Sequence, residues 1–369
     1  MKCAAIISEY NPFHNGHKYQ IDLLRSQGFD VIVAVMSGSI VQRGEIAIVD
    51  KFTRARAAVS CGVDIVVELP APFSCTSGEY FARAGVIAAD ALGADSLSFG
   101  SECGDIALLR IHANERRFAE PAEGAARAEL SGTSFSSNDM LGIEYLRAIK
   151  ATGSEMQPIT HKRVGGAYNS ETPDTEFSSA TAIRRALKDG NIADVQSQMP
   201  REAYVAMNEG LSLICSSGLS DEIYSGILLT ALRTADKEEL SAYAFMNGGL
   251  ASRLKNAAER AKSADELYRL AATKVYTNSR IRRAALCTVC RMPDTVRRHV
   301  PEYLSLLCAN ERGREYLATQ KTKLPVLCTV RQKKEYGSFE YEKRFDMLFE
   351  TVRKYGGSVR LCTAPPMML

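Results

Sequence analysis

The amino-acid sequence predicts an α/β fold: a parallel sheet with helices on both faces, followed by a mainly α-helical C-terminal part. Short apolar runs alternate with amphipathic stretches through the first half of the chain, whereas strand signals fade after about Thr181. The turn-like residues Asp189-Gly190-Asn191 lie near this change. We therefore expect two domains, residues 1–190 and residues 191–369.

Five apolar runs in the first half have the length and composition of buried strands. They are Cys3–Ser8, Val31–Met36, Val63–Glu68, Asp95–Phe99 and Met156–His161. The helices expected between them are His17–Gln27, Lys51–Cys61, Ser77–Leu92 and Met140–Ala151. Right-handed crossovers place the carboxyl ends of parallel strands on one edge, and ligands bind there where the winding of the sheet reverses.

The second half is dominated by helical patterns. The expected helices are Ala182–Lys188, Glu222–Ala235, Lys237–Phe245, Ala251–Ala261, Ala264–Thr273 and Arg280–Cys287. Near the C-terminus, Val326–Val330 and Ser358–Cys362 are expected as strands.

Composition indicates an ordinary globular protein without a membrane segment. The chain has 369 residues, 46% of them hydrophobic and 24% charged. Its apolar runs are far shorter than the ~20 residues of a membrane span, and no signal peptide is apparent at the start. We expect a soluble, cytoplasmic protein.

The cysteines do not suggest a disulfide framework or a metal site. Ten cysteines are present, and only Cys287 and Cys290 form a C-x-x-C pair, with His299 nearby. Because a structural zinc site normally needs four ligands, we expect no metal held by protein residues at this motif.

Charge is distributed unevenly along the chain. Residues 1–249 contain 22 Lys and Arg against 31 Asp and Glu, a net −9, whereas residues 250–369 contain 24 against 12, a net +12. A basic C-terminal part favours a polyanionic partner such as a nucleic acid. An Arg-rich helical surface exposed only to solvent explains the same pattern equally well.

The segment Glu9-Tyr10-Asn11-Pro12-Phe13-His14-Asn15-Gly16-His17 carries the strongest chemical signal. It follows the first expected strand and opens the first expected helix, whose N-terminus favours phosphate binding. His14 and His17 lie three residues apart, so their side chains would project to the same side of a helix. Two imidazoles there can donate hydrogen bonds to phosphate oxygens as charge develops on them. The alternative is a pair of surface or helix-capping histidines.

A second phosphate-binding signal is the string Ser178-Ser179-Ala180-Thr181-Ala182-Ile183-Arg184. Its hydroxyl residues suit a helix N-cap, and Arg184 falls within the first turns. By itself the string is weak, because such caps are common.

Together these strings resemble the HxGH superfamily of nucleotidyltransferases, and the likeness is closest to the bacterial tRNA(Met) cytidine acetate ligase family. Further motifs carry the resemblance from residue 1 to about residue 320. They are Met36-Ser37-Gly38, Gln42-Arg43-Gly44-Glu45, Gly62-Val63-Asp64, Glu68-Leu69-Pro70, Phe99-Gly100-Ser101-Glu102, residues 138–142, and Arg280 with Arg283.

The resemblance implies a Rossmann-like nucleotidyltransferase domain that uses ATP, with Mg²⁺ expected as its companion ion. It also implies acetate and elongator methionine tRNA as the other substrates. Acetate would attack the α-phosphate to form acetyl-adenylate, and the acetyl group would pass to N4 of the wobble cytidine. Acetate is ionised at neutral pH, so the first step needs no general base.

The family's functional residues map onto named positions of this sequence. The catalytic pair is His14 and His17. The ATP site comprises Ile7, Ser8, Glu9, Tyr10, Asn11, Pro12, Phe13, His14, Asn15, Gly16, His17, Lys18, Tyr19, Gln20, Gly100, Asn138, Arg163, Ile183 and Arg184. For Asn138 the alternative is a helix N-cap, and for Arg163 it is a surface ion pair. Gln42-Arg43-Gly44 is expected near the acetate.

Arg280 and Arg283 are expected to face RNA phosphate from one side of a helix. Two other readings stay open: an adenylyltransferase acting on a small metabolite, such as nicotinate mononucleotide or phosphopantetheine, and a non-catalytic RNA-binding protein on the same fold. The sequence does not indicate an oligomeric state.

Overall fold

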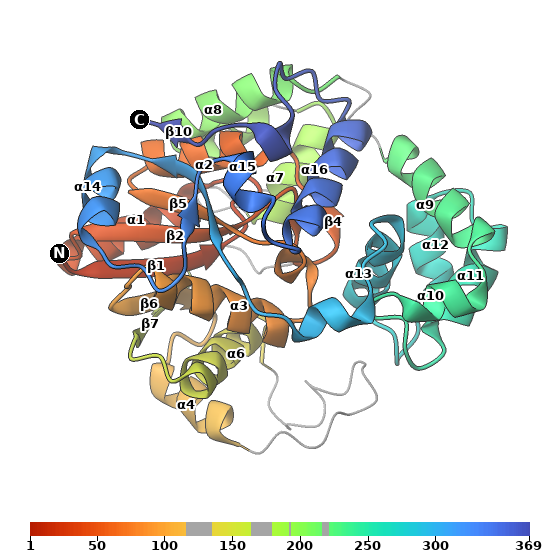
Figure 1. The fold of residues 1–369 in the computed structure, drawn as a ribbon, viewed down its shortest axis with the longest axis horizontal. Coiled ribbons are helices and arrows are strands. Elements are labelled where there is room, and N and C mark those ends of the chain that lie inside the picture. The colour runs from red at the N-terminus through yellow and green to blue at the C-terminus, as the bar shows by residue number, and fades with distance from the viewer. Residues whose placement is uncertain (116–134, 164–178, 192, 216–220) are drawn as a thin grey trace.

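The computed structural model describes residues 1–115, 135–163, 179–191, 193–215 and 221–369 (Figure 1). Its centre is one mostly parallel sheet with strand order β10-β8-β5-β2-β1-β6-β7, and β9 pairs with β8 beside this path. The parallel strands are β1 (Cys3–Ser8), β2 (Val31–Ser37), β5 (Ile65–Leu69), β6 (Ser96–Ser101) and β7 (Gln157–Lys162). All five strands expected from the first half are thus confirmed.

The winding of the sheet reverses at β1. From β1 the chain proceeds to β2 and β5 on one side, whereas β6 and β7 lie on the other side. The loops after β1 and β6 therefore meet at the carboxyl edge, where an open α/β sheet offers its ligand crevice.

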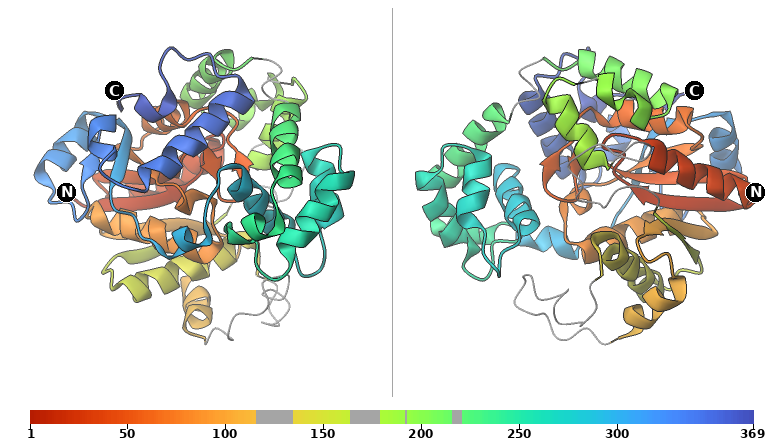
Figure 2. Two further views of the ribbon diagram at one scale, coloured as in Figure 1. Left: turned by 45° about the vertical axis from the view of Figure 1, so that its right-hand side comes forward. Right: turned by 180° about the vertical axis from the view of Figure 1, so that it is seen from behind.

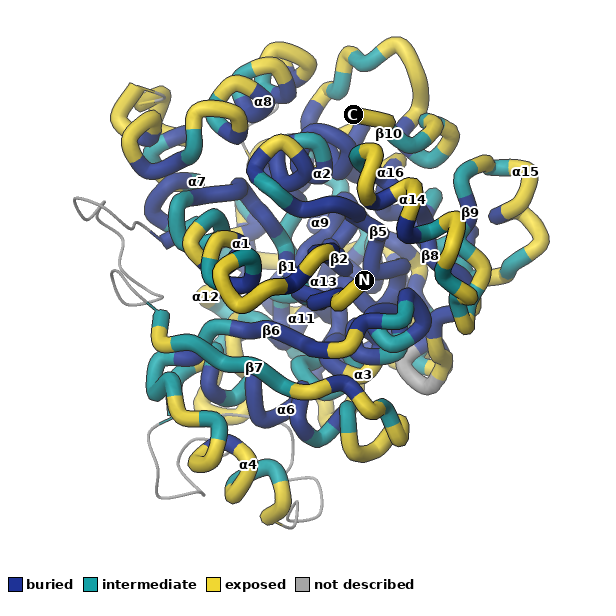
Figure 3. Tube along the Cα trace, turned by 90° about the vertical axis from the view of Figure 1, so that its left-hand side faces the viewer, coloured by how far each residue is buried: buried dark blue, intermediate teal, exposed yellow. Residues whose placement is uncertain are grey.

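Helices cover both faces of the sheet, as Figure 3 shows by the buried strands at the centre of the tube. One face packs against α1 (Asn15–Ser26), α2 (Lys51–Ser60), α7 (Ala180–Lys188), α8 (Arg201–Ser212) and the C-terminal α16 (Phe339–Arg353). The other face packs against α3 (Gly78–Ala91), α4 (Ile106–Asn114), α6 (Ser137–Thr152) and α14 (Glu311–Thr319).

A helical unit lies to one side of the sheet (Figure 2), and its apolar core also includes Phe345, Leu348 and Val352 of α16. Its helices are α9 (Glu222–Thr234), α10 (Lys237–Ala242), α11 (Leu250–Arg260), α12 (Ala264–Ala271) and α13 (Asn278–Val289). The helical part expected after residue 191 is therefore present. We call residues 221–298 the helical unit below.

The chain then returns to the sheet, which the sequence analysis did not anticipate. β8 (Leu304–Ala309) pairs antiparallel with β5, and the short strands β9 (Val326–Leu327) and β10 (Met367–Met368) pair with β8. The expected strand Ser358–Cys362 is wrong, because only a 3-10 turn, Leu361–Thr363, forms there. The expected strand Val326–Val330 shrinks to the two residues of β9, and the four-residue helix α15 (Val330–Lys333) follows.

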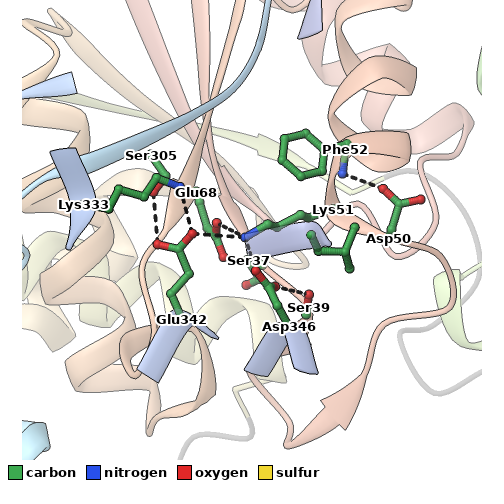
Figure 4. Close-up of polar contacts among 12 residues, drawn as sticks. Ser37, Ser39, Asp50, Lys51, Phe52, Glu68, Ser305, Lys333, Glu342 and Asp346 are labelled. Atoms are coloured by element: carbon green, nitrogen blue, oxygen red, sulfur yellow. Dashed lines mark hydrogen bonds and ion pairs between the residues drawn. The ribbon is translucent and has the colours of Figure 1, made fainter. Parts of the chain in front are cut away.

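A fully buried charge cluster attaches α16 to the carboxyl edge of the sheet (Figure 4). The Lys51 ammonium at the start of α2 lies 2.7 Å from Glu68 of β5, 3.2 Å from Glu342 and 2.8 Å from Asp346 of α16. Lys333 adds a second cation, 2.9 Å from Glu342. Buried charges stay in place only when each is paired and hydrogen-bonded, so this cluster specifies where α16 docks.

No helix among the described residues combines the length and apolar character needed to cross a membrane.

Candidate active site

The two histidines of the motif form the first turn of α1. His14 is the N-cap, in extended backbone conformation, and its ring accepts a hydrogen bond from the Gly16 amide at 3.1 Å. The His17 ring accepts from the His14 amide at 3.2 Å, which closes a reciprocal cap of the capping-box kind. The two rings stack with centroids 3.8 Å apart. The same-side placement expected from their spacing is confirmed.

These hydrogen bonds determine where each imidazole carries its proton. In both rings Nδ1 is the acceptor of a backbone N–H. A neutral imidazole that accepts at Nδ1 carries its hydrogen on Nε2. Among the described residues neither Nε2–H has an acceptor, so each can donate to a ligand.

The environment keeps both rings neutral. Burial, followed by the positive charges of Arg163 and Arg184, lowers the pKa of His14 to about 3. Burial and the neighbouring His14 and Arg163 hold the pKa of His17 well below 6.5. Both imidazoles are thus without a net charge, and the positive potential beside them comes from the two arginines.

Gly16 is required by the cap. A Cβ at this position would lie 3.0 Å from Cε1 and 3.1 Å from Nδ1 of the His14 ring. Any larger residue would press on the ring that caps α1. Gly16 therefore allows the His14 ring to take its capping position.

Two arginines hold the loop between β1 and α1 through hydrogen bonds to its backbone carbonyls. Fully buried Arg54 of α2 donates to the Glu9 carbonyl at 2.8 Å, and Arg184 of α7 donates to the Asn11 carbonyl at 2.9 Å. The Asn11 side chain accepts from the Ile48 amide at 2.8 Å. The backbone of this loop is therefore fixed independently of any ligand.

Several expected ATP-site residues build this loop and are shielded from solvent. Tyr10, Pro12 and Phe13 are buried, and the Tyr10 ring meets the His17 ring edge-on with centroids 4.8 Å apart. Burial raises the pKa of Tyr10, which keeps its hydroxyl neutral. The Tyr10 and Phe13 rings thus pack against the imidazole of His17.

The other expected residues of this stretch have mixed surroundings. Ile7 is half-buried and faces Gly85, where a Cβ would come within 2.6 Å of it. Asn15 donates to the Ser197 carbonyl at 2.9 Å, and Gln20 donates to Ser98 at 3.0 Å. The remaining members are Ser8, which is buried, Glu9, which accepts from the Gln42 amide, Lys18, which pairs with Asp22, and Tyr19, which is exposed.

A second group of expected residues comes from β6, β7 and α6. Gly100 lies where a Cβ would meet the Arg163 side chain at 3.0 Å, so its lack of a side chain makes room for this arginine. Asn138 donates to Glu102 at 2.6 Å, and Arg163 lies 3.7 Å from the same carboxylate. The structure thus brings Gly100, Asn138 and Arg163 together around one acidic residue.

The structure decides the two alternatives, a helix N-cap for Asn138 and a surface ion pair for Arg163. The N-cap of α6 is Ser136, so the capping role for Asn138 is wrong. The half-exposed ion pair expected as the alternative for Arg163 does form with Glu102, while the charge of Arg163 still lowers the pKa of His14.

The second string supplies structure around Arg184. Ser179 caps α7 by accepting from the Ala182 amide at 3.2 Å, and Ile183 is buried in the core. Ser178 lies outside the described residues. Arg184 also lies 3.4 Å from Glu45. The cap is confirmed, whereas the Ile183 side chain contributes packing and leaves only its backbone for a ligand.

The sequence did not point to three residues that contact the expected site residues: Arg54, Glu102 and His161. His161 of β7 lies near Gly100 and the Tyr19 ring, and burial followed by Arg163 lowers its pKa to about 4. Glu102 stands two residues after Gly100 in the motif Phe99-Gly100-Ser101-Glu102, which is the signal that would have found it.

The expected exposed stripe of Arg280 and Arg283 does not form. Both side chains are buried, with 6% and 9% of their surface exposed, because they pack on the aromatic rings of Tyr276 and Phe245. Arg280 also donates to the side chain of Asn247 at 2.7 Å. A direct RNA contact by these two residues stays a prediction, and it would require their neighbours to move.

Paired neutral histidines at a helix N-terminus, placed where a parallel sheet reverses its winding, define a nucleotidyltransferase of the HIGH type. The family model described as HIGH Nucleotidyl Transferase matches residues 1–122 and 112–359. Within this class the chain belongs to the tRNA(Met) cytidine acetate ligase family.

Two relatives and two solved structures support this assignment. The tRNA(Met) cytidine acetate ligase of Syntrophotalea carbinolica is 36% identical, covering 94% of this chain and 91% of that protein. That of Caldicellulosiruptor bescii is 33% identical over 90% and 88%. The crystal structure of apo Thermotoga maritima TmcAL has a TM-score of 0.89 at 27% identity, and the form bound with alpha-thio ATP scores 0.84 at 26%. Each of these two structural matches covers 100% of this chain and 100% of the Thermotoga maritima chain.

Proposed function

We propose that this chain is an ATP-dependent acetate ligase that acetylates N4 of the wobble cytidine of elongator methionine tRNA through an acetyl-adenylate. The observation that carries the proposal is the pair of imidazoles whose Nδ1 atoms are occupied by backbone N–H groups, which leaves two Nε2–H donors at the start of α1. Support also comes from relatives that bear this activity in their names and from a similar structure bound with alpha-thio ATP.

In the first step an acetate oxygen attacks the α-phosphorus of ATP, and the bond from this phosphorus to the bridging oxygen of pyrophosphate breaks. Negative charge grows on the α-phosphate oxygens and on the departing pyrophosphate. The Nε2–H groups of His14 and His17 are the donors available to stabilise it, and the positive end of the α1 dipole and the charges of Arg163 and Arg184 add positive potential. Since acetate is already ionised, the residues need only position and stabilise.

Mg²⁺ is proposed as the ion that accompanies the triphosphate. Mg²⁺ keeps several waters and binds largely through substrate phosphates, so it needs few protein ligands. Within the described ranges of the chain, no three His, Cys, Asp or Glu side chains gather as a metal site. The ion would supply charge neutralisation at the phosphates, and the protein residues would orient the nucleotide.

In the second step N4 of cytidine attacks the acetyl carbonyl carbon, the bond from this carbon to the AMP oxygen breaks, and N4 loses a proton. The N4 lone pair is delocalised into the ring, which is why the acyl group has to be activated first. The wobble base must leave its stack to reach the crevice, as single-stranded anticodon loops permit. We propose that this takes place on cytoplasmic tRNA.

ATP–pyrophosphate exchange, measured with and without acetate, tests the proposal. We expect exchange that depends on acetate, and acetylation of a cytidine when methionine tRNA is added. Exchange that needs another acid or a nucleotide would instead support the adenylyltransferase of small metabolites. A folded chain that binds tRNA and shows no exchange would support the non-catalytic RNA-binding protein.

A further inference from the structure

A short hairpin connects three parts of the molecule that the proposed reaction must keep aligned. Strands β3 (Ile40–Val41) and β4 (Glu45–Ile46) pair antiparallel, and residues 42–44 form the turn between them. We call residues 39–47 the connecting hairpin. Each strand has only two residues, so the position of the hairpin depends on what its base and its tip contact.

The base of the connecting hairpin is held by α16 on both sides. The Ser39 hydroxyl donates to Asp346 at 2.6 Å, and the buried Arg353 guanidinium donates to the carbonyls of Ile46 and Ala47 at 2.9 and 3.0 Å. Asp346 is itself paired with Lys51 in the buried charge cluster. The hairpin therefore leaves the sheet edge in a fixed direction.

The tip of the hairpin contacts the ATP loop. The Gln42 amide donates to the Glu9 carboxylate at 3.0 Å, and Arg184 reaches Glu45 at 3.4 Å while it also donates to the Asn11 carbonyl. The tip therefore lies against the loop that carries His14, while Arg54 and the Ile48 amide hold that loop through bonds of their own.

The same tip supports α13 of the helical unit. Gly44 has a φ of +76°, and a Cβ there would lie 2.7 Å from the Arg283 amide nitrogen, so the α13 backbone rests directly on this glycine. Arg282 forms a close ion pair with Glu45, and Arg283 reaches the Gln42 carbonyl at 3.5 Å. Glu45 thus offers one carboxylate oxygen to Arg282 and the other to Arg184.

We propose that the ion pair between Glu45 and Arg282 is a positioning contact that holds the helical unit at a set orientation to the ATP loop during acetyl transfer. This inference rests on the proposed function. Neither side chain belongs to the groups that contact ATP in our account. Arg54, Arg184 and the Ile48 amide keep their own bonds to the ATP loop, so adenylate formation continues without the pair. Transfer depends on it, because the RNA and the adenylate are then presented by different parts of the chain.

The ion pair between Glu45 and Arg282 is partly shielded from solvent, and its removal should leave the protein folded. The three side chains expose 26% (Glu45), 32% (Arg282) and 18% (Arg184) of their surface, so the pair is shielded from solvent without being buried. Removing it leaves no fully buried charge uncompensated. Arg282 also covers the Tyr268 ring at 5.2 Å, which a glutamine would cover less well.

The test compares Arg282→Gln and Glu45→Gln with the double variant and with Arg282→Lys. For Arg282→Gln we expect acetate-dependent exchange within about twofold of wild type, and a kcat/KM for tRNA acetylation about tenfold lower. Glu45→Gln should lose transfer similarly, the double variant should be no worse than either single variant, and Arg282→Lys should recover part of it. The matched control is Glu209→Gln, which breaks the half-exposed pair of Arg56 with Glu209 on α8.

Several results would overturn the positioning role. Additive losses in the double variant, equal losses in exchange and transfer, or unchanged transfer would each do so. A flatter salt dependence of tRNA binding in Arg282→Gln would show that this residue contacts RNA instead.

A readout without activity separates this inference from the proposed function. Amide hydrogen exchange over residues 40–46 should be faster in Arg282→Gln and Glu45→Gln, and unchanged in Glu209→Gln. Protection equal to wild type in both variants would overturn the contact even in an active enzyme. A wild-type chain without acetate-dependent exchange would overturn the function and leave the hydrogen-exchange result to decide the contact.

Discussion

At the scale of single residues, the His14 ring serves two purposes with its two nitrogens. Nδ1 accepts the Gly16 amide and so replaces one of the hydrogen bonds that the first turn of a helix lacks, while Nε2–H stays available. A serine or aspartate would cap the helix as well, but neither would place a second nitrogen donor at the same point. The use of histidine as a cap is thus explained by what the far side of its ring can do.

The tautomer and the neutrality of both rings can be checked directly. With the pKa of His14 lowered to about 3 and that of His17 held well below 6.5, the folded protein should keep both imidazoles neutral from pH 8 down to pH 6. Nitrogen NMR of the imidazoles should show an unprotonated Nδ1 and a protonated Nε2 throughout this range. In the unfolded chain the same histidines should titrate near their ordinary value. Protonation of either ring near pH 6.5 in the folded protein would contradict the proposed donor arrangement.

Loss of either donor should affect the rate of the chemical step. We expect His14→Ala or His17→Ala to lower acetate-dependent ATP–pyrophosphate exchange by about 10²–10³-fold, the usual cost of one preorganised donor. His299→Ala, on an exposed residue outside the crevice, should leave exchange unchanged. Circular dichroism should confirm that the variants fold. Exchange close to wild type in both active-site variants would refute the role of the pair.

At the scale of elements, α16 is attached to the sheet by charges of unequal importance. The pKa of Glu342 is lowered to about 2: burial opposes this, and the cations Lys51 and Lys333 outweigh it. Glu342 also accepts from Tyr303 at 2.9 Å and from Ser305 at 3.2 Å. Burial raises the pKa of Glu68 to about 8, since Lys51 compensates it only in part. The two cations therefore favour the ionised form of Glu342, whereas burial favours the protonated form of Glu68.

Two conservative variants in this cluster should differ sharply. At pH 6, Glu342→Gln should lower the free energy of unfolding by about 3–5 kcal/mol, because it leaves two buried ammonium groups undercompensated. Glu68→Gln should change it by less than about 1 kcal/mol, because glutamine resembles the protonated acid. Urea unfolding of both variants measures the difference. Equal costs would contradict the assignment of the proton to Glu68.

The pH dependence of stability gives an independent check of the same assignment. Between the ordinary glutamic acid pKa of 4.5 and the raised value of about 8, the folded state binds a proton that the unfolded state has released. The contribution of Glu68 to stability is therefore complete below pH 4.5 and is lost as the pH rises to about 8. Glu68→Gln should remove this decline. A decline that persists in the variant would have to originate in another group.

How much of the fold the sequence reveals differs from element to element. The strands β1, β2 and β5 are continuous apolar runs, and such runs identify buried parallel strands without knowledge of their partners. α1 begins two residues earlier than expected, because its N-cap is a histidine and the preferred caps are Ser, Thr, Asp and Asn. Local signals therefore sufficed wherever the element was defined by its own residues.

The sequence pattern did not predict elements whose structure depends on contacts with distant parts of the chain. The apolar run of β8 has the composition of a strand, yet its neighbour β5 lies far earlier in the chain. α16 buries Glu342 and Asp346 on its inner face, which breaks the apolar periodicity that marks an amphipathic helix. The connecting hairpin has strands too short to show any period.

The same distinction applies to the site. The motif of His14, Gly16 and His17 can be recognised from four consecutive residues. The roles of Glu45 and Arg54 depend on contacts with distant loops, which the sequence does not reveal.

At the scale of the whole molecule, the basic side chains of the C-terminal part do not form the exposed stripe that the sequence indicated. Some of them are buried and others are exposed. A guanidinium that is already bonded and covered, such as that of Arg280, has few counterions to release when RNA binds. Exposed cations of the helical unit, such as Lys274 beside Tyr276, keep their counterions until RNA arrives. Only the second kind contributes to the salt dependence of binding.

Salt titrations of tRNA binding can therefore separate the two kinds of residue. For Arg280→Gln we expect the slope of log K against log salt to equal that of wild type, because Arg280 donates to Asn247 and packs on Tyr276 in the free protein. Any loss of affinity in this variant would then be the same at all salt concentrations and would come with lower stability. For Lys274→Gln we expect a slope smaller by about one, as for the loss of one phosphate contact. If the Arg280 variant showed the smaller slope instead, Arg280 would have to leave its buried position to reach RNA, and the face originally expected from the sequence would be the correct one.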